Sequence, residues 1–267
     1  MPRPQREIAL PGQQSAASRP DSWVALTRFT RARIALGRAG ASWRTETLLN
    51  FRLAHAQARD AVCRPFDPDS VEQQLRSLGY ETTRLTTEAH ARDVFLKRPD
   101  LGRKLSEESR ELLAQNAAAW SRRNLVVLVS DGLSGLAAET QAAPLLAKLL
   151  PLLTEAGWTI CPIFVVPYAR VKLQDEIGGL LKTQHALALL GERPGLGSPD
   201  SLGAYFTFEP GLDKTDADRN CVSNIRAQGL PPEEAAKKIA QLLLCSQAQG
   251  CSGIKLKEDA APIKAVE

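Results

Sequence analysis

The spacing of apolar positions changes along the chain, and the change separates a helical first part from an α/β second part. From Asp21 to Gly37, and again over residues 45–62, apolar residues recur at an approximately helical interval, and in the second segment the arginines lie largely off the apolar face. The glycine-rich run at 37–43 between the two segments is typical of a turn. The pattern therefore predicts a basic helical hairpin.

A more irregular region follows the hairpin. Asp and Ser at 67–70 predict the start of a short helix over 70–79, because such side chains accept hydrogen bonds from the free N–H groups of a first helical turn. The segment 81–102 mixes β-branched and turn residues and predicts irregular, partly extended chain. Residues 101–120 have the spacing of an amphipathic helix.

Beyond residue 120, apolar strands alternate with helices. Strands are predicted at 124–132, 158–166, 185–191 and 204–208, and helices at about 138–156, 171–182 and 231–249. Strands that are apolar on both faces are typical of a parallel sheet covered by helices on both sides. We therefore predict an α/β fold with a Rossmann-like parallel-sheet domain over 121–257 and a helical, Arg-rich N-terminal region over 21–120.

The two ends of the chain and its overall composition add further limits. Residues 1–20 lack apolar periodicity and predict a flexible arm, and residues 258–267 form a tail. The chain has 267 residues, of which 43% are hydrophobic and 24% charged, which is typical of a soluble globular protein. Its longest apolar stretch, 143–153, is shorter than the roughly 20 residues that span a bilayer. Because no secretion signal is recognisable either, we expect a cytoplasmic protein with no membrane partner.

The cysteines and histidines do not have the spacing of a metal site. No two cysteines form a C-x-x-C pair, and the histidines are far apart, which favours reduced thiols and packing or surface histidines. We therefore expect no metal ligands among them. The residues concerned are Cys63, Cys161, Cys221, Cys245, Cys251, His55, His90 and His185.

The positive charge of the chain is local. Residues 1–64 contain eleven Arg and no Lys against four acids, a net charge of +7, whereas the remainder carries −3. The planar guanidinium of Arg binds carboxylates in a fixed geometry, which favours a protein interface, and nucleic acid is the alternative partner. We expect the following arginines at such an interface: Arg28, Arg31, Arg38 and Arg44.

Ligands of open α/β sheets bind beyond the carboxyl ends of the strands. Three polar, Gly-containing segments follow predicted strands, at 130–135, 167–178 and 191–197, and together they predict a pocket. None has the G-x-G-x-x-G pattern of a dinucleotide site or the pattern of a P-loop, so neither of these ligands is supported. Two alternatives stay open: the loop 191–197 could be only a tight Gly/Pro turn, and Cys221 could be a buried small hydrophobe.

Several strings, in this order, resemble the small subunit of ethanolamine ammonia-lyase. They are RPDLGRKL (98–105), VVLVSDGLS (126–134), YARVKLQDEIG (168–178), LGERPGLG (190–197) and DRNCVSNI (218–225). Residues 37–62 also resemble the N-terminal helical region of that family, so the resemblance covers about 21–257. Long strings in a fixed order are far more specific than one short motif.

The resemblance implies an enzyme of two chain types that converts ethanolamine to acetaldehyde and ammonia by adenosylcobalamin radical chemistry. It implies that a TIM-barrel large subunit holds the substrate and that this chain covers part of the cobalamin, within a dodecamer of six heterodimers. Cofactor contacts carried over from the family fall on Val171, Glu192 and Cys221. No catalytic residue and no metal ligand is carried over to this chain.

The chemistry of cobalamin agrees with these three residue types. The corrin ring has an apolar face, which suits Val171, and a rim of amide groups, for which the Glu192 carboxylate is an acceptor, while Cys221 is a small filler. The chain lacks the D-x-H-x-x-G string, so the resemblance implies base-on binding. It also implies a bacterial cytoplasmic protein, with packaging in a microcompartment left open. The competing hypothesis is a stand-alone Rossmann-like regulatory or nucleic-acid-binding protein.

Overall fold

The computed structural model describes residues 21, 23–30 and 32–257, so the predicted arm, the predicted tail and Arg31 lie outside the described residues. The chain divides into two compact units, one up to Ala56 and the other from Gln57 onward. We describe each unit separately.

The first unit contains less helix than its apolar spacing predicts. Among the described residues of the segment predicted as the first helix, only a 3-10 turn, η1 (Val24–Arg28), forms, so the predicted helix and the predicted helical hairpin were wrong. The turn has no side-chain cap, and Ala35 further along has a φ of +54°. A short helix in water is marginal unless its apolar face is buried. The predicted turn at 37–43 is confirmed as a hairpin of β1 (Arg38–Ala39) and β2 (Ser42–Trp43).

Helix α1 (Thr45–Cys63) confirms the second predicted helix, but its apolar stripe is exposed. The exposed apolar side chains of residues 23–53 are those of Trp23, Val24, Leu26, Phe29, Trp43, Leu48, Leu49, Phe51 and Leu53. Exposed apolar side chains in such number are unusual for a soluble monomer.

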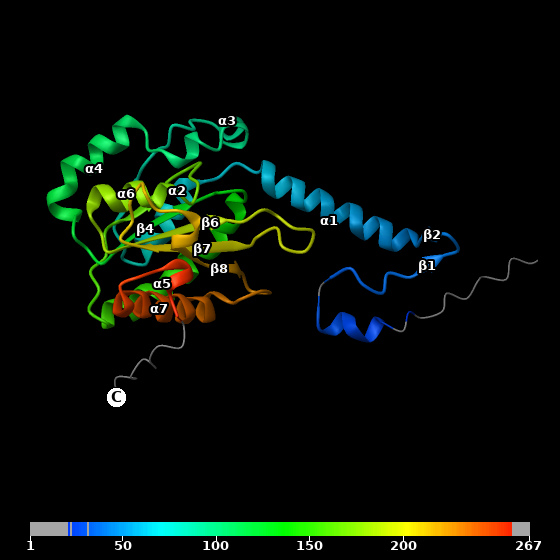
Figure 1. Ribbon diagram of the computed structural model, residues 1–267. Helices are drawn as coiled ribbons and strands as arrows, with labels where there is room; N and C mark the ends of the chain where they lie inside the picture. Colours follow the sequence, from blue (N-terminus) through cyan, green and yellow to red (C-terminus); the bar gives the residue numbers. More distant parts are fainter. Residues whose placement is uncertain (1–20, 22, 31, 258–267) are drawn as a thin grey trace, which may run out of the picture. The chain divides into compact units, whose positions relative to one another are not determined.

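The second unit is built on a six-stranded sheet with the order β3-β5-β4-β6-β7-β8 (Figure 1). Its strands are β3 (Thr82–Arg84), β4 (Leu125–Ser130), β5 (Ile163–Val165), β6 (His185–Gly191), β7 (Leu202–Phe208) and β8 (Arg219–Ile225). The first four strands in the sheet order are parallel, whereas β7 and β8 are antiparallel additions. The predicted α/β, Rossmann-like fold is confirmed, with a sheet that is mostly but not wholly parallel.

Two strands were not expected from the sequence, and both lie at the edges of the sheet. β3 belongs to the segment predicted as irregular, and it pairs only with β5. β8 is polar, because only Val222 and Ile225 of its seven residues are buried. An edge strand with one exposed face lacks the continuous apolar run that identifies a central strand such as β4.

Helices cover both faces of the sheet. Helices α2 (Pro68–Ser77), α5 (Gly135–Glu155) and α7 (Pro232–Gln249) pack on one face, and α4 (Glu107–Trp120) and α6 (Leu173–Leu181) pack on the other. Successive strand residues alternate between the two cores, as Leu187 and Ala188 do. The remaining short helices are α3 (Arg92–Lys97), η2 (Leu101–Arg103), η3 (Asp216–Asp218) and η4 (Gly253–Lys255).

Side-chain caps set where the helices begin. Asp67 accepts a hydrogen bond from the Ser70 N–H and starts α2, as predicted. Ser106 caps α4, which therefore begins later than the predicted residue 101, and Ser134 caps α5, which begins earlier than the predicted 138. Each cap satisfies an N–H group that has no partner within its helix.

Two expectations concerning membranes and metals can be compared with the described residues. Within residues 21–257, apart from 22 and 31, no helix is long and apolar enough to cross a membrane. In the same range no group of three or more His, Cys, Asp or Glu residues could hold a metal ion.

His185 is fully buried between Trp158 and Phe208, and its Nε2 is 3.1 Å from the Ser246 hydroxyl. It is a packing residue, as the sequence indicated.

Burial of His185 predicts a specific loss of stability in acid. Burial lowers its pKa from 6.5 to about 4, so between these values the unfolded chain binds a proton that the folded chain does not. The contribution of neutral His185 to the free energy of unfolding is fully present above pH 6.5 and decreases as the pH drops towards 4. The total loss is about 3 kcal/mol.

The measurement is urea unfolding of the native chain and the His185→Phe variant between pH 4 and pH 7. We expect the difference in unfolding free energy between the two proteins to change across this window. A difference that is independent of pH would contradict a buried, neutral His185.

Candidate functional site

The loops that follow β4 and β6 approach each other backbone to backbone. The Leu133 N–H donates to the Gly191 carbonyl at 2.8 Å. A Cβ on Gly191 would lie 2.7 Å from the Ser134 carbonyl carbon, and Gly132 has a φ of +49° and also faces the Gly191 backbone. Both positions therefore require glycine, one for space and one also for its conformation.

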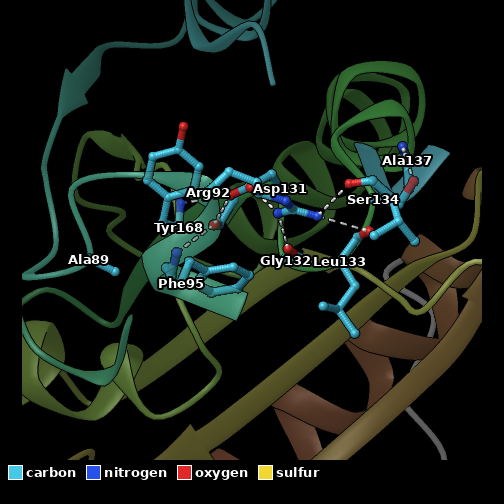
Figure 2. A network of polar contacts seen from close by, with 12 residues as sticks. Ala89, Arg92, Phe95, Asp131, Gly132, Leu133, Ser134, Ala137 and Tyr168 are labelled. Carbon is cyan, nitrogen blue, oxygen red and sulfur yellow. Dashed lines mark hydrogen bonds and ion pairs between the residues drawn. The ribbon is translucent and has the colours of Figure 1, made fainter. Parts of the chain in front are cut away.

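A buried ion pair joins this loop to its neighbours (Figure 2). The Asp131 carboxylate is 1% exposed, and its Oδ2 accepts from Arg92 Nη1 at 2.6 Å. Arg92 also donates to the carbonyls of Gly132 and Leu133, as Figure 2 shows, and to that of Val62 at the end of α1. One guanidinium thus fixes α3, the end of α1 and the loop after β4 in one arrangement.

The other carboxylate oxygen of Asp131 holds the loop after β5. Its Oδ1 accepts from the Tyr168 N–H at 2.7 Å, and the neighbouring Ser130 hydroxyl accepts from the Ala169 N–H at 3.0 Å. Tyr168 has a φ of +62°, an uncommon conformation for a bulky residue. Burial raises the pKa of Asp131, and the Tyr168 N–H and the Arg92 charge offset part of that shift. The pair therefore keeps a strained segment in place directly before Val171.

Val171 lies in this loop, between β5 and α6. Its side chain is half-buried and packs against the core between the sheet and helices α4 and α6. It also lines a pocket of about 420 Å³. The other residues of that pocket are Arg103, Arg170, Lys172, Lys214, Thr215, Asp216 and Arg219.

Glu192 follows β6 directly and is held against β8. Its Oε2 accepts from the Ser201 hydroxyl at 2.6 Å and from the Asn224 N–H at 3.2 Å. Among the described residues, no hydrogen bond reaches its Oε1. A Cβ on Gly203 would lie 2.9 Å from that atom and equally close to the Tyr205 ring, so glycine at 203 makes room for both side chains.

Cys221 belongs to the same group of side chains as Glu192. It is the register partner of Tyr205 across β7 and β8. Partial desolvation by its neighbours and then the Glu192 charge raise the pKa of the Cys221 thiol, and burial is the main cause of the raised pKa of Tyr205. Both groups are therefore protonated near neutral pH. Cys221 is exposed, so its alternative interpretation as a buried small hydrophobe was wrong.

The loop 191–197 is a tight turn as well as the support of Glu192. Gly195 and Ser198 exchange two backbone hydrogen bonds of 3.2 Å. The buried Arg226 side chain donates to the Gly197 carbonyl at 3.0 Å and so attaches the turn to the end of β8. The turn interpretation and the placement of Glu192 beside β8 are compatible.

The three expected residues are connected to different degrees. Glu192 and Cys221 share Tyr205 as a neighbour. Val171 is linked to them less directly, through Arg219, which lines its pocket and stands two residues before Cys221 on β8, and through the core against which both Val171 and Tyr205 pack. Sequence reasoning missed Tyr205, Gly203 and Arg219. The alternation in β7, where Leu202, Ala204 and Phe206 enter one core, could have placed Gly203 and Tyr205 together on the opposite face.

Fold and site together define an α/β protein of Rossmann type with a candidate binding surface at its strand ends and over β7 and β8. The family model for the ethanolamine ammonia-lyase light chain (EutC) matches residues 20–257. The chain therefore belongs to the ethanolamine ammonia-lyase light-chain family, which confirms the resemblance and the assignment to a lyase subunit.

Individual relatives agree with the family match, and each is named ethanolamine ammonia-lyase small subunit. Those from Azotobacter vinelandii and Ralstonia nicotianae are each 48% identical over 239 residues, which is 89% of this chain and 88% of the relative. The relative from Pseudomonas aeruginosa strain UCBPP-PA14 is 44% identical over 252 residues, which is 94% of this chain and 92% of the relative.

The buried ion pair predicts a large effect of substituting Arg92. Arg92→Ala leaves the buried Asp131 carboxylate without its counter-charge, and breaking such a pair costs about 3–5 kcal/mol. We expect a corresponding loss in the free energy of unfolding, measured in urea, and faster hydrogen exchange in residues 130–135 and 167–171.

The matched control is Arg98→Ala, which removes an Arg from the exposed Arg98–Asp100 pair. Exposed pairs contribute little, so the unfolding midpoint of this variant should stay close to that of the native chain. Equal destabilisation by the two substitutions would contradict the role of the Arg92–Asp131 pair.

Proposed function

We propose that this chain is the small subunit of an adenosylcobalamin-dependent ethanolamine ammonia-lyase, which converts ethanolamine to acetaldehyde and ammonia, and that it covers part of the cobalamin. Family membership supports the enzyme. The observation that carries the role of this chain is the group formed by Glu192, the half-buried Tyr205 and the exposed Cys221, in which Glu192 keeps one carboxylate oxygen without a donor among the described residues.

The residues of this surface fit the rim of a corrin ring. A corrin has amide side chains, and an amide N–H can donate to the Oε1 of Glu192, whose other oxygen is already occupied by Ser201 and Asn224. Those two hydrogen bonds fix the direction of the carboxylate before a ligand arrives. A larger residue at Gly203 would fill the space beside it.

The other two proposed contacts bind and shield the cofactor. Val171 presents a half-buried apolar side chain, and Cys221 presents a thiol whose raised pKa keeps it uncharged. When bound, adenosylcobalamin supplies the cobalt–carbon bond whose cleavage begins the radical chemistry. We assign no catalytic acid, base or nucleophile to this chain. We propose base-on binding, because the sequence lacks D-x-H-x-x-G and His185 is buried in the core.

We further propose a TIM-barrel large subunit as the partner, in a dodecamer of six heterodimers, with residues 21–120 of this chain in contact with it. The name small subunit, given to the relatives, supports a larger partner. The exposed apolar side chains of Trp23, Phe29 and Trp43 support an interface in this region, since such side chains are typical of one. Arg28 and Arg38 are exposed in the same region, and Arg44 is half-buried.

The location that we propose for the enzyme is the bacterial cytoplasm. The alternative location is a bacterial microcompartment within the cytoplasm. We propose neither nucleic acid nor membrane as a partner.

The enzyme proposal is tested by reconstitution. The chain is combined with the large subunit of ethanolamine ammonia-lyase from Azotobacter vinelandii, the source of one relative, and with adenosylcobalamin. We expect ethanolamine-dependent release of ammonia from the mixture and none from either chain alone, because each chain holds only part of the site. A mixture that neither forms a complex nor releases ammonia would overturn the proposal.

The proposed contact of Glu192 is tested by Glu192→Gln. The substitution keeps the shape but replaces one acceptor oxygen with an N–H₂ donor, so the hydrogen bond to a corrin amide is lost. We expect cyanocobalamin to bind the assembled enzyme about tenfold more weakly, as the loss of one charge-assisted hydrogen bond implies. Equilibrium dialysis measures the affinity.

The control for Glu192→Gln is Glu155→Gln, the same change at an exposed position at the end of α5. Its affinity for cyanocobalamin should equal that of the native chain. If the Glu192 variant also retains native affinity, Glu192 is not a cofactor contact.

A further inference from the structure

The pocket that Val171 lines is strongly basic. Five of its eight lining residues carry a positive charge and one carries a negative charge. The basic side chains come from separate segments: Arg103 ends η2, Arg170 and Lys172 precede α6, Lys214 precedes η3, and Arg219 begins β8. The fold therefore gathers cations that are far apart in the sequence.

The neighbouring acids do not balance this charge. The buried Asp175 carboxylate accepts from Arg219 Nη1 at 2.8 Å on both oxygens and lies 3.3 Å from Lys172 Nζ. Asp216 is fully exposed and lies 3.3 Å from Arg219 Nε. These two acids, counted against the five lining cations, leave three positive charges. Asp218, which acts on Lys214, and Asp131, which acts on Arg170 but is paired with Arg92, reduce this excess without removing it.

Two of the arginines keep donors that are not used. The Arg219 side chain is only 5% exposed, yet its Nη2 has no hydrogen-bond partner among the described residues. The buried Nε of Arg170 also has no hydrogen-bond partner among the described residues. A buried donor without an acceptor is costly, so an acceptor that enters the pocket and reaches such a donor gains free energy that solvent does not supply.

The electrostatic surroundings also favour an anion. Burial lowers the pKa of Arg170, and the charges of Arg103 and Arg92 lower it further, so positive charges repel one another here. Helix α6 begins at the pocket, and its N-cap residue Lys172 makes no side-chain cap hydrogen bond. The positive end of the helix dipole therefore adds to the field of the side chains.

We propose that this pocket binds a phosphate group. Several cations that converge from different directions match the oxygens of a tetrahedral phosphate, and guanidinium groups donate to phosphate in pairs. Two sources have this chemistry: free inorganic phosphate, and the phosphodiester in the nucleotide loop of cobalamin. The second source rests on the proposed function and would bring the nucleotide loop to the same pocket as Val171.

The first arm of the test uses inorganic phosphate and the full chain. The variant is Arg103→Ala combined with Lys214→Ala. Neither side chain forms an ion pair with a carboxylate among the described residues, so removing both leaves no buried acid without its counter-charge. The control is Lys148→Ala, an exposed Lys of α5 on the opposite face of the sheet. Equilibrium dialysis with radiolabelled phosphate measures binding at constant ionic strength.

We expect the double variant to bind phosphate at least about tenfold more weakly than the native chain, as the loss of charge-assisted contacts implies, and the control to bind it unchanged. Failure of the native chain to bind phosphate, together with unchanged corrinoid binding in the second arm, would overturn the proposal. A double variant that binds both phosphate and cyanocobalamin with native affinity would also overturn it.

The second arm identifies the source and uses the chain assembled with the large subunit. Cyanocobalamin carries the nucleotide loop, whereas dicyanocobinamide lacks that loop and its phosphodiester. If the double variant binds cyanocobalamin about tenfold more weakly and cobinamide unchanged, the source is the nucleotide loop. If only free phosphate binding is weakened, the source is inorganic phosphate.

Two further outcomes distinguish the phosphate proposal from the proposed function and from binding of a partner carboxylate. If the native complex binds no corrinoid at all, the proposed function fails, and the phosphate arm alone decides whether the pocket exists. If the double variant weakens assembly with the large subunit but changes neither phosphate nor corrinoid binding, the pocket receives a carboxylate of the partner, and the phosphate proposal is overturned.

Discussion

The arrangement of the strand ends depends on the buried pair of Asp131 and Arg92. Each oxygen of the carboxylate holds a different segment, one through Arg92 and the other through the Tyr168 N–H, and the two Nη atoms of the guanidinium also donate to backbone carbonyls. Because a buried carboxylate is costly unless all of its surroundings are satisfied, these segments cannot separate independently. The loops are thus fixed without a ligand, which reduces the entropy lost when one binds.

The two faces of the antiparallel strands β7 and β8 have different surroundings. Helix α7 packs on β7 and β8 from one side, but the opposite side carries the half-buried Tyr205 and the exposed Cys221. Burial and the Glu192 charge raise the pKa of both groups, so the surface offers hydrogen-bonding atoms without a nucleophile or base near neutral pH. A surface of this kind is suited to holding and shielding a ligand.

Sequence patterns predicted the parts of the fold whose residues are buried by the chain itself. β4 and β6 are apolar on both faces and were predicted, whereas the polar edge strand β8 has no such pattern. The helix predicted after Asp21 failed because spacing alone does not supply a surface to bury it. At the site, Glu192 follows directly from its place after a strand, but Tyr205 becomes its neighbour only through the antiparallel pairing of β7. Arg92 and Asp131 are 39 residues apart, and no local pattern connects them.

The chain has exposed apolar side chains that its own fold does not bury, and it has hydrogen-bonding atoms that its own fold leaves without a partner. The two kinds of surface require different partners. The exposed Trp23, Phe29 and Trp43 of the first unit have large apolar rings, which gain free energy mainly by burial against other apolar surface. The unused donor of Arg219 and the unused acceptor of Glu192 gain most from single polar atoms placed in fixed directions. A protein partner fits the first requirement and a small polar ligand fits the second. In the proposed function these two requirements belong to different parts of the chain, with association in the N-terminal region and ligand contact at the sheet.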